Sequence, residues 1–248
     1  MMFDTEGVVL AALIFVAAML YASVGHAGAS GYLAAMALFG VAPEVMKPTA
    51  LSLNILVALI ATFKFYRAGA FSWRIFLPLA AGSVPLAWLG GTLVLPGHFY
   101  KPLVGMVLVY AAWASLKRAS RPQDAQLRTP PTVLLIACGA VLGLLSGLTG
   151  VGGGIFLSPL LLFLRWAEVR VISGIAAAFI LLNSIAGLLG VIRVAPELPA
   201  ALPLWAVAAI AGGFLGAELG SRRLGNAGIQ RALALVLAVA GVKMIATA

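Results

Sequence analysis

Long apolar runs separated by short polar stretches recur from one end of the chain to the other. Several of these runs approach or reach the length of about 20 residues that a membrane-spanning helix needs. The pattern therefore predicts an all-α polytopic integral membrane protein. Ten apolar segments can be marked, at about 8–24, 28–41, 49–65, 73–95, 103–116, 133–146, 154–164, 171–192, 202–219 and 229–246.

The longest polar stretch, residues 117–131, divides the ten segments into two sets of five. We interpret it as a cytoplasmic linker between a first transmembrane repeat, residues 1–116, and a second, residues 132–248. The two parts resemble each other, since Ser23–Gly31 can be laid on Ser146–Gly154 with a short apolar segment in each case. The common order of such matches predicts an internal repeat. Further matches in the same order pair Gly82 with Gly212 and Gly90 with Gly220.

The Lys and Arg residues predict the orientation of the repeats, because cytoplasmic loops of membrane proteins carry an excess of them. With the linker in the cytoplasm, twelve Lys and Arg residues fall on that side and four on the other. Each repeat has an odd number of segments, so the second enters the membrane in the opposite sense, as in the inverted repeats of many secondary transporters. One alternative stays open: segments 28–41 and 154–164 either complete full crossings or form re-entrant hairpins with the segments before them.

A cluster of glycines opens the second half of the chain. Glycine is the poorest ordinary residue for a helix interior, so the cluster predicts a broken helix within the membrane. In hydrocarbon such a break is tolerated only where the freed N–H and C=O groups are buried in protein or line a wet cavity. We therefore expect either a tight packing point or a binding site. The glycines are Gly147, Gly150, Gly152, Gly153 and Gly154.

The short segments 28–41 and 154–164 follow the two glycine-rich stretches. The first has 14 residues, which span about 21 Å as a helix against about 30 Å of hydrocarbon. Both are therefore predicted to begin inside the membrane, with their N-termini approaching each other under the inverted topology. Unpaired N–H groups and the positive end of the helix dipole attract negative charge. The arrangement predicts an anion site near the middle of the membrane.

Polar residues in and beside the two breaks complete the candidate site. His26 is a candidate ligand or proton carrier, with a hydrogen bond to a freed backbone carbonyl as the alternative. For Asn54 and Asn183 the alternative is hydrogen bonding between helices, and Ser and Thr hydroxyls can bond their own helix instead. The expected substrate-binding residues are Ser23, Gly25, His26, Gly28, Ser30, Gly31, Thr49, Ser52, Asn54, Thr149, Gly150, Gly152, Gly153, Gly154, Ser158 and Asn183.

Two charged residues beside the apolar segments have simpler expected roles. Lys47, which precedes Pro48, is interpreted as a surface anchor, with a charge at the solute entry as the alternative. Glu218 is the one acid near a helix interior, and we expect it to pair with Arg222 four residues further on.

Composition narrows the class of function. The chain is 63% hydrophobic and 9% charged, with a net charge of +9, and its basic residues lie between apolar runs, which indicates contact with lipid headgroups rather than nucleic acid. The single Cys138 cannot form an internal disulfide and is expected to be a small core residue. The N-terminus lacks a basic region before the first apolar run, so we expect that run to be retained. With two His, one Cys and no catalytic or P-loop motif, neither an enzyme nor a bound metal or cofactor is expected.

At the residues of the breaks the chain resembles the TauE/SafE family of membrane permeases, described as sulfite exporters. The resemblance rests on Gly150–Leu160 and the weaker Gly25–Gly31, supported by Thr49–Asn54 and the basic turn Phe65–Arg74, and it covers nearly the whole chain. It implies movement, usually outward, of small sulfur-containing or carboxylated anions across the bacterial inner membrane. The first motif departs from the second, because it carries Ala and Ser where the second is almost all glycine.

The sequence thus predicts a secondary transporter, in the direction of export, for small anions such as sulfite, sulfoacetate or related organosulfur and carboxylate anions. Its expected partners are the small anionic solute and membrane lipids, with no nucleic acid, and a homodimer is left open. Two alternatives remain. One is an anion channel of the same architecture, and the other is a membrane subunit that works with a soluble partner.

Overall fold

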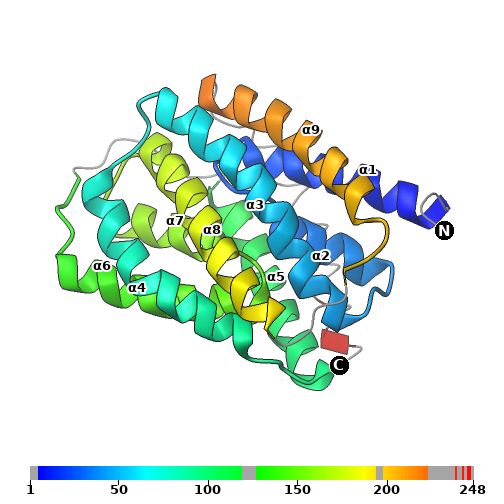
Figure 1. Ribbon diagram of the computed structural model, residues 1–248. Helices are drawn as coiled ribbons and strands as arrows, with labels where there is room; N and C mark the ends of the chain where they lie inside the picture. The colour runs from blue at the N-terminus through cyan, green and yellow to red at the C-terminus, as the bar shows by residue number, and fades with distance from the viewer. Residues whose placement is uncertain are drawn as a thin grey trace.

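A computed structural model describes residues 5–118, 127–193 and 198–222, with residues 238, 242, 245 and 246, and of residues 114–118 and 222 it describes the backbone alone. Within these ranges the chain forms α-helices and no strand (Figure 1). The predicted all-helical class is confirmed. The helices are α1 (Thr5–Ala22), α2 (Ala29–Leu38), α3 (Pro43–Arg67), α4 (Trp73–Thr92), α5 (Gly97–Arg118), α6 (Thr132–Thr149), α7 (Gly154–Phe163), α8 (Val169–Ile192) and α9 (Leu202–Arg222).

Six of the helices in the described ranges are long and apolar enough to cross a membrane, which makes the chain a multi-pass membrane protein. The two short helices α2 and α7 have 10 residues each, about 15 Å at 1.5 Å per residue, so neither crosses the hydrocarbon core alone. Apart from residues 238, 242, 245 and 246, the predicted tenth segment, 229–246, lies outside the described residues, as does most of the predicted linker.

The helix breaks occur where the glycines predict them. Between α1 and α2, Gly25 and Gly28 have φ angles of 78° and 112°, and the N-cap of α2 is Gly28 itself. Between α6 and α7, three glycines have positive φ angles near 80°, a region that L side chains rarely adopt. These three are Gly150, Gly152 and Gly153. The breaks therefore depend on glycine backbone geometry and are buried within the protein.

The two short helices end in the same way. Gly40 after α2 and Arg165 after α7 both have positive φ, of 70° and 58°. In both, the next N–H donates back to a carbonyl in the helix, Val41 to Met36 and Trp166 to Leu161, which is a Schellman C-cap. When the two short helices are superposed by their first residues and their C-caps, Ala29 is equivalent to Gly154. The sequence alignment put Gly31 there, two residues away.

Glycines hold α6 against α4 and α9 against α1 at backbone distance. A Cβ on Gly139, Gly143 or Gly147 of α6 would fall far inside the contact distance of an α4 carbonyl oxygen, at Leu79, Ser83 or Ala87. Three of the four glycines of α9 meet carbonyls of α1, or of the residue directly after it, in the same manner. In both helices the glycines recur every four residues, a pattern of small residues that lets membrane helices approach closely. The α9 contacts are Gly212 with Phe15, Gly216 with Met19 and Gly220 with Ser23.

The helices therefore form two groups that do not coincide with the two sequence halves. One buried cluster is drawn mainly from α1, α2, α3, α5 and α9, and the other from α4, α6, α7 and α8. Figure 1 shows α1 and α9 side by side along one edge and α4 and α6 along the opposite edge, with α3 and α8 between them. The fourth helix of the first half, α4, packs with α6, α7 and α8 of the second half. The fourth helix of the second half, α9, packs with α1, α2, α3 and α5 of the first half. This exchange follows the same pattern in both halves, as a repeat predicts.

Candidate functional site

The two helix breaks meet in space although they lie far apart in the sequence. Nε2 of His26, in the first break, lies 3.0 Å from the carbonyl oxygen of Gly154 and 3.1 Å from Oγ of Ser158, both in α7. All three residues are buried. His26 thus makes the backbone hydrogen bond that the sequence allows for it, and it makes that bond to the opposite half.

The second break is enclosed by the two long helices α3 and α8. Nδ2 of Asn54 lies 3.4 Å from both the carbonyl oxygen of Val151 and Oγ of Ser184. A Cβ on Gly152 would lie 2.7 Å from that same nitrogen, so glycine is required by space as well as by φ. The structure therefore brings Asn54 against the glycine-rich loop, between the two helix groups.

Backbone donors at the start of both short helices have no acceptor among the described residues. The first N–H groups of a helix have no partner within it, and neither Gly28 nor Gly153 provides a side-chain cap. Among the described residues, no hydrogen bond is made by the N–H groups of Ala29, Ser30 and Gly31 or of Gly152, Gly153, Gly154 and Ile155. The positive ends of the α2 and α7 dipoles lie at these donors.

Several buried polar side chains near the second break also lack partners in the described part of the chain. They include both amide atoms of Asn183, Oδ1 of Asn54 and the hydroxyl of Ser146, and the hydroxyl of Thr49 in α3 is also without a partner. Asn183 is one helical turn beyond Phe179 and Ile180, whose side chains pack on Gly153 and Gly152. Ser146 lies against Gly153, with Cβ 3.3 Å from the Cβ that a substitution would add. Buried polar groups in proteins are nearly always paired, so a set without partners needs a physical account.

The remaining predicted residues are positioned mainly by their own helix. The hydroxyls of Ser23, Ser52 and Thr149 donate to Leu20, Pro48 and Leu145, three or four residues earlier, as Ser and Thr in helices often do. Ser30 is buried in the first turn of α2. Two glycines serve close packing. Gly25 abuts the backbone of Ser173, and Gly31 abuts Ala17.

Lys47 is not the surface anchor that its sequence position suggested. It is 8% exposed, and its Nζ donates to the carbonyls of Gly90, Gly91 and Leu93 at the end of α4, at 3.1 to 3.2 Å. Its backbone lies beside Gly150, whose added Cβ would be 3.2 Å from the Lys47 carbonyl oxygen. A buried cation therefore caps α4 next to the second break, where it also complements the negative end of that helix.

Three residues outside the list of expected substrate-binding residues also join the site. Ser146 and Ser184 approach the glycine-rich loop, and the hydroxyl of Tyr100 in α5 donates to the carbonyl of Thr149 at 3.1 Å. Ser146 opens the glycine motif, and its place one turn before Gly150 is the signal that could have identified it. Tyr100 is 49 residues from its partner, and no local pattern indicates that contact.

No group of three or more His, Cys, Asp and Glu side chains that could hold a metal ion occurs in the part of the chain the structure describes. Among the described residues, the basic side chains placed beside the breaks are His26 and Lys47. Glu218 forms an ion pair with Lys64 of α3, a partner that the sequence did not indicate. The expected partner Arg222 has a side chain outside the described residues.

Comparison with known families and proteins shows which family this chain belongs to. The family model described as sulfite exporter TauE/SafE matches residues 10–244. The chain belongs to the TauE/SafE family. A TauE/SafE relative from Sinorhizobium fredii, described as probable membrane transporter protein y4hK, is 42% identical over 245 residues, covering 98% of this chain and 99% of the relative. A second, described as a probable membrane transporter protein of Methanocaldococcus jannaschii, is 27% identical over 146 residues, 57% of this chain and 53% of the relative. No solved structure matches the chain.

Membership of TauE/SafE and the names of these relatives indicate a membrane transporter. The resemblance inferred from Gly150–Leu160 and Gly25–Gly31 is thereby confirmed.

Proposed function

We propose that this membrane transporter is a secondary exporter of small anions of the class of sulfite, sulfoacetate and related organosulfonates or carboxylates. The solute would bind between the two helix breaks, at the starts of α2 and α7. The family description supports the sulfur oxyanion as substrate class. The size and charge of such anions suit a site built from converging N–H donors and neutral side chains.

The observation that carries the proposal is the set of buried donors without acceptors around the second break. An N–H or hydroxyl left unpaired in the interior costs about 1–3 kcal/mol. The break has four backbone N–H groups and the hydroxyl of Ser146 without acceptors in the described residues, with the unpaired amide of Asn183 one turn further along α8, and the proposal adds the unpaired hydroxyl of Thr49. An oxyanion accepts several hydrogen bonds at once, so one bound solute would satisfy groups that otherwise carry this cost.

Positive potential at the site would come from helix ends rather than from a salt bridge. Each of the starts of α2 and α7 contributes about half a positive charge. Lys47 is close to Gly150 but its ammonium is bonded to α4 carbonyls. A weakly charged, neutral-donor site allows the anion to leave again, as transport requires.

The test is anion efflux from proteoliposomes that contain the purified protein, loaded in turn with sulfite, sulfoacetate, acetate and chloride. Thr49→Val and Asn183→Leu remove unpaired polar atoms without changing the glycines. Losing one hydrogen bond to a charged ligand should weaken solute binding about tenfold or more. Folding should be unaffected or improved, because the removed groups have no partner within the described protein.

Thr62→Val is the matched control. Thr62 lies in the same helix, and its hydroxyl is likewise buried without a partner in the described residues, but it is 13 positions from Thr49, about 20 Å along α3. Its efflux should equal that of the unaltered protein. Normal efflux in Thr49→Val and Asn183→Leu would overturn the proposed site, and currents of single-channel size would replace the exporter by a channel.

A further inference from the structure

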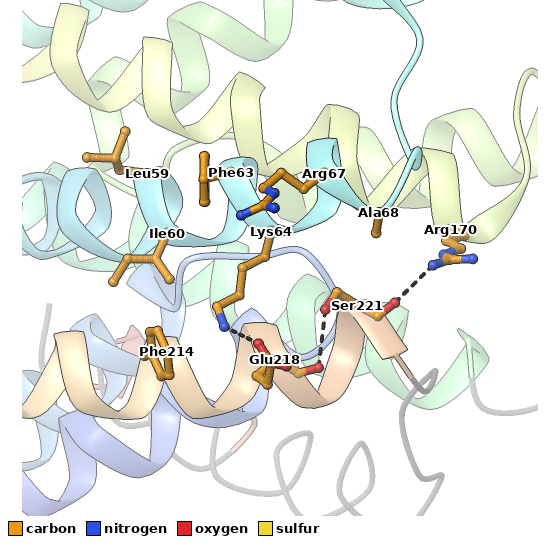
Figure 2. Close-up of a pocket in the computed structure, with 10 residues that line it drawn as sticks. All are labelled: Leu59, Ile60, Phe63, Lys64, Arg67, Ala68, Arg170, Phe214, Glu218 and Ser221. Atoms are coloured by element: carbon orange, nitrogen blue, oxygen red, sulfur yellow. Dashed lines mark hydrogen bonds and ion pairs between the residues drawn. The ribbon is translucent and has the colours of Figure 1, made fainter.

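A cavity of about 850 Å³ lies between the C-terminal ends of α3 and α9 and the start of α8. This size falls in the range of about 300–1,000 Å³ that is typical of small-molecule sites. Figure 2 shows the side chains around it, with Arg170 hydrogen-bonded to Ser221 on one side and Phe214 on the other. The candidate transport site uses none of these residues. We refer to it as the α3–α9 cavity.

The charges that line the α3–α9 cavity do not cancel. Lys64 forms an ion pair with Glu218, the one acid among the lining residues. Its ammonium also lies 3.8 Å from the centre of the Phe214 ring. Arg67 and Arg170 are exposed, and the described residues offer neither of them a carboxylate. Two guanidinium groups therefore leave an excess of positive charge that suits a phosphate, which arginine binds through paired N–H donors.

The end of the cavity away from Arg67 and Arg170 is apolar and open. Leu59, Phe63 and Phe214 are 57%, 60% and 52% exposed. In a membrane-spanning chain, large apolar side chains that are exposed within a helix face lipid. On both helices the apolar residues precede the polar ones, Leu59 before Arg67 and Phe214 before Ser221, so the lining changes from apolar to basic toward the same end.

The level of the cavity is that of a membrane surface. Aromatic side chains gather beside Arg67, where the rings of Tyr66, Phe71 and Trp73 pack edge to face. Tyr and Trp are enriched where a membrane meets water. The Lys and Arg distribution places the ends of α3 and α9 and the start of α8 in the cytoplasm, and the structure brings these three ends together. Anionic lipids are concentrated in that leaflet and attract basic side chains.

We propose that the α3–α9 cavity binds the headgroup of a phospholipid with net negative charge. Its phosphate contacts the guanidinium groups of Arg67 and Arg170, and an acyl chain lies along Leu59, Phe63 and Phe214. The lipid would link α3 and α9 of one helix group to the start of α8 in the other. The inference does not depend on which solute the protein transports.

The test counts lipids bound to the purified protein by native mass spectrometry. Delipidated protein in an uncharged detergent is titrated with dioleoyl phosphatidylglycerol, dioleoyl phosphatidylcholine or glycerol 3-phosphate. We expect phosphatidylglycerol to bind more tightly than phosphatidylcholine. The double variant Arg67→Gln/Arg170→Gln should lower its affinity about tenfold or more. Phosphatidylcholine binding should change less, because its choline cation already opposes binding at a site with excess positive charge.

Two further variants keep the result interpretable. Arg74→Gln removes an exposed arginine on the same predicted side, outside the cavity lining, and should bind phosphatidylglycerol normally. Arg67→Lys/Arg170→Lys keeps the charge and should recover part of the lost affinity. Unchanged phosphatidylglycerol binding in the Gln double variant would overturn the proposal. So would equal affinity for glycerol 3-phosphate, which would indicate a free anion, or no lipid binding at all, which would indicate that another part of the chain fills the cavity.

Discussion

Several residues around the second break have buried polar atoms without hydrogen-bond partners in the described residues, which lowers the stability of the fold. A purely structural role would not require these polar atoms. The amide of Asn183 could be replaced by an apolar side chain of similar size, which in a buried position is usually neutral or stabilising. Like Thr49, Ser146 and Asn54, it carries atoms without partners in the described residues. Hydrogen bonding between helices, the simpler interpretation of Asn54, accounts for its Nδ2 but leaves its Oδ1 without a partner in the described residues. At this scale, solute binding is the interpretation that accounts for the whole set.

Lys47 gives a prediction about stability. Replacing it by Met keeps much of the side-chain volume but leaves the carbonyls of Gly90, Gly91 and Leu93 without their donor. We expect a loss of about 2 kcal/mol of unfolding free energy, measured as a lower melting temperature in detergent. Arg74→Met, which alters an exposed cation, should change stability by less than about 0.5 kcal/mol. Equal stability of the two variants would mean that the buried ammonium contributes nothing.

Among the secondary-structure elements, the tight approach of α6 to α4 is the feature most open to a direct test. A Cβ on Gly143 would overlap the carbonyl oxygen of Ser83, whereas a Cβ on Gly187 of α8 would find its nearest neighbour at 3.5 Å. We therefore expect Gly143→Ala to cost about 1–3 kcal/mol by overpacking. Gly187→Ala should be neutral or stabilise by up to about 1 kcal/mol, because Ala is the better helix former. Thermal unfolding of both variants checks this, and equal melting temperatures would contradict it.

The positions of the helix breaks could be predicted from the local sequence, whereas the start of α3 and the partners of Lys47 could not. Glycine's φ freedom and the cost of a free backbone in lipid were enough to locate both breaks, and α7 begins at Gly154 as expected. Helix α3 begins six residues earlier than its apolar segment, because Pro43 starts it and the buried ammonium of Lys47 is hydrogen-bonded to backbone carbonyls. The carbonyls that bind Lys47 come from α4, 43 to 46 residues away. Partners at such a distance leave no periodic pattern.

For the whole molecule, the inverted orientation of the two repeats is still a prediction. The matching lengths of α1 and α6, of α2 and α7, and of α3 and α8 support a repeat. The residues after α2 and α7, Gly40 and Arg165, are equivalent positions by their caps and are exposed. In an inverted arrangement they lie on opposite sides of the membrane, and in a parallel one they lie on the same side.

Cysteine labelling distinguishes these arrangements. In a Cys138→Ser background, single substitutions Gly40→Cys, Gly69→Cys and Arg165→Cys are treated with a membrane-impermeant maleimide in sealed vesicles of known orientation. We expect Gly69→Cys and Arg165→Cys to react from the cytoplasmic side and Gly40→Cys from the other. All three positions lie in exposed turns with positive φ, so their backbone strain is comparable. Labelling of Gly40→Cys and Arg165→Cys from one side would rule out inversion.

The exchange of the fourth helices changes which parts of the protein could move during transport. Glycine contacts hold α9 closely against α1 and α6 closely against α4. The two sequence halves therefore cannot move apart as rigid bodies without disrupting both of these helix–helix interfaces. The natural rigid bodies are instead the two mixed helix groups, and the surface between them passes beside His26, Asn54 and the glycine-rich loop. Relative rotation of these bodies would carry the two short helices apart, exposing their N-termini to one side of the membrane at a time.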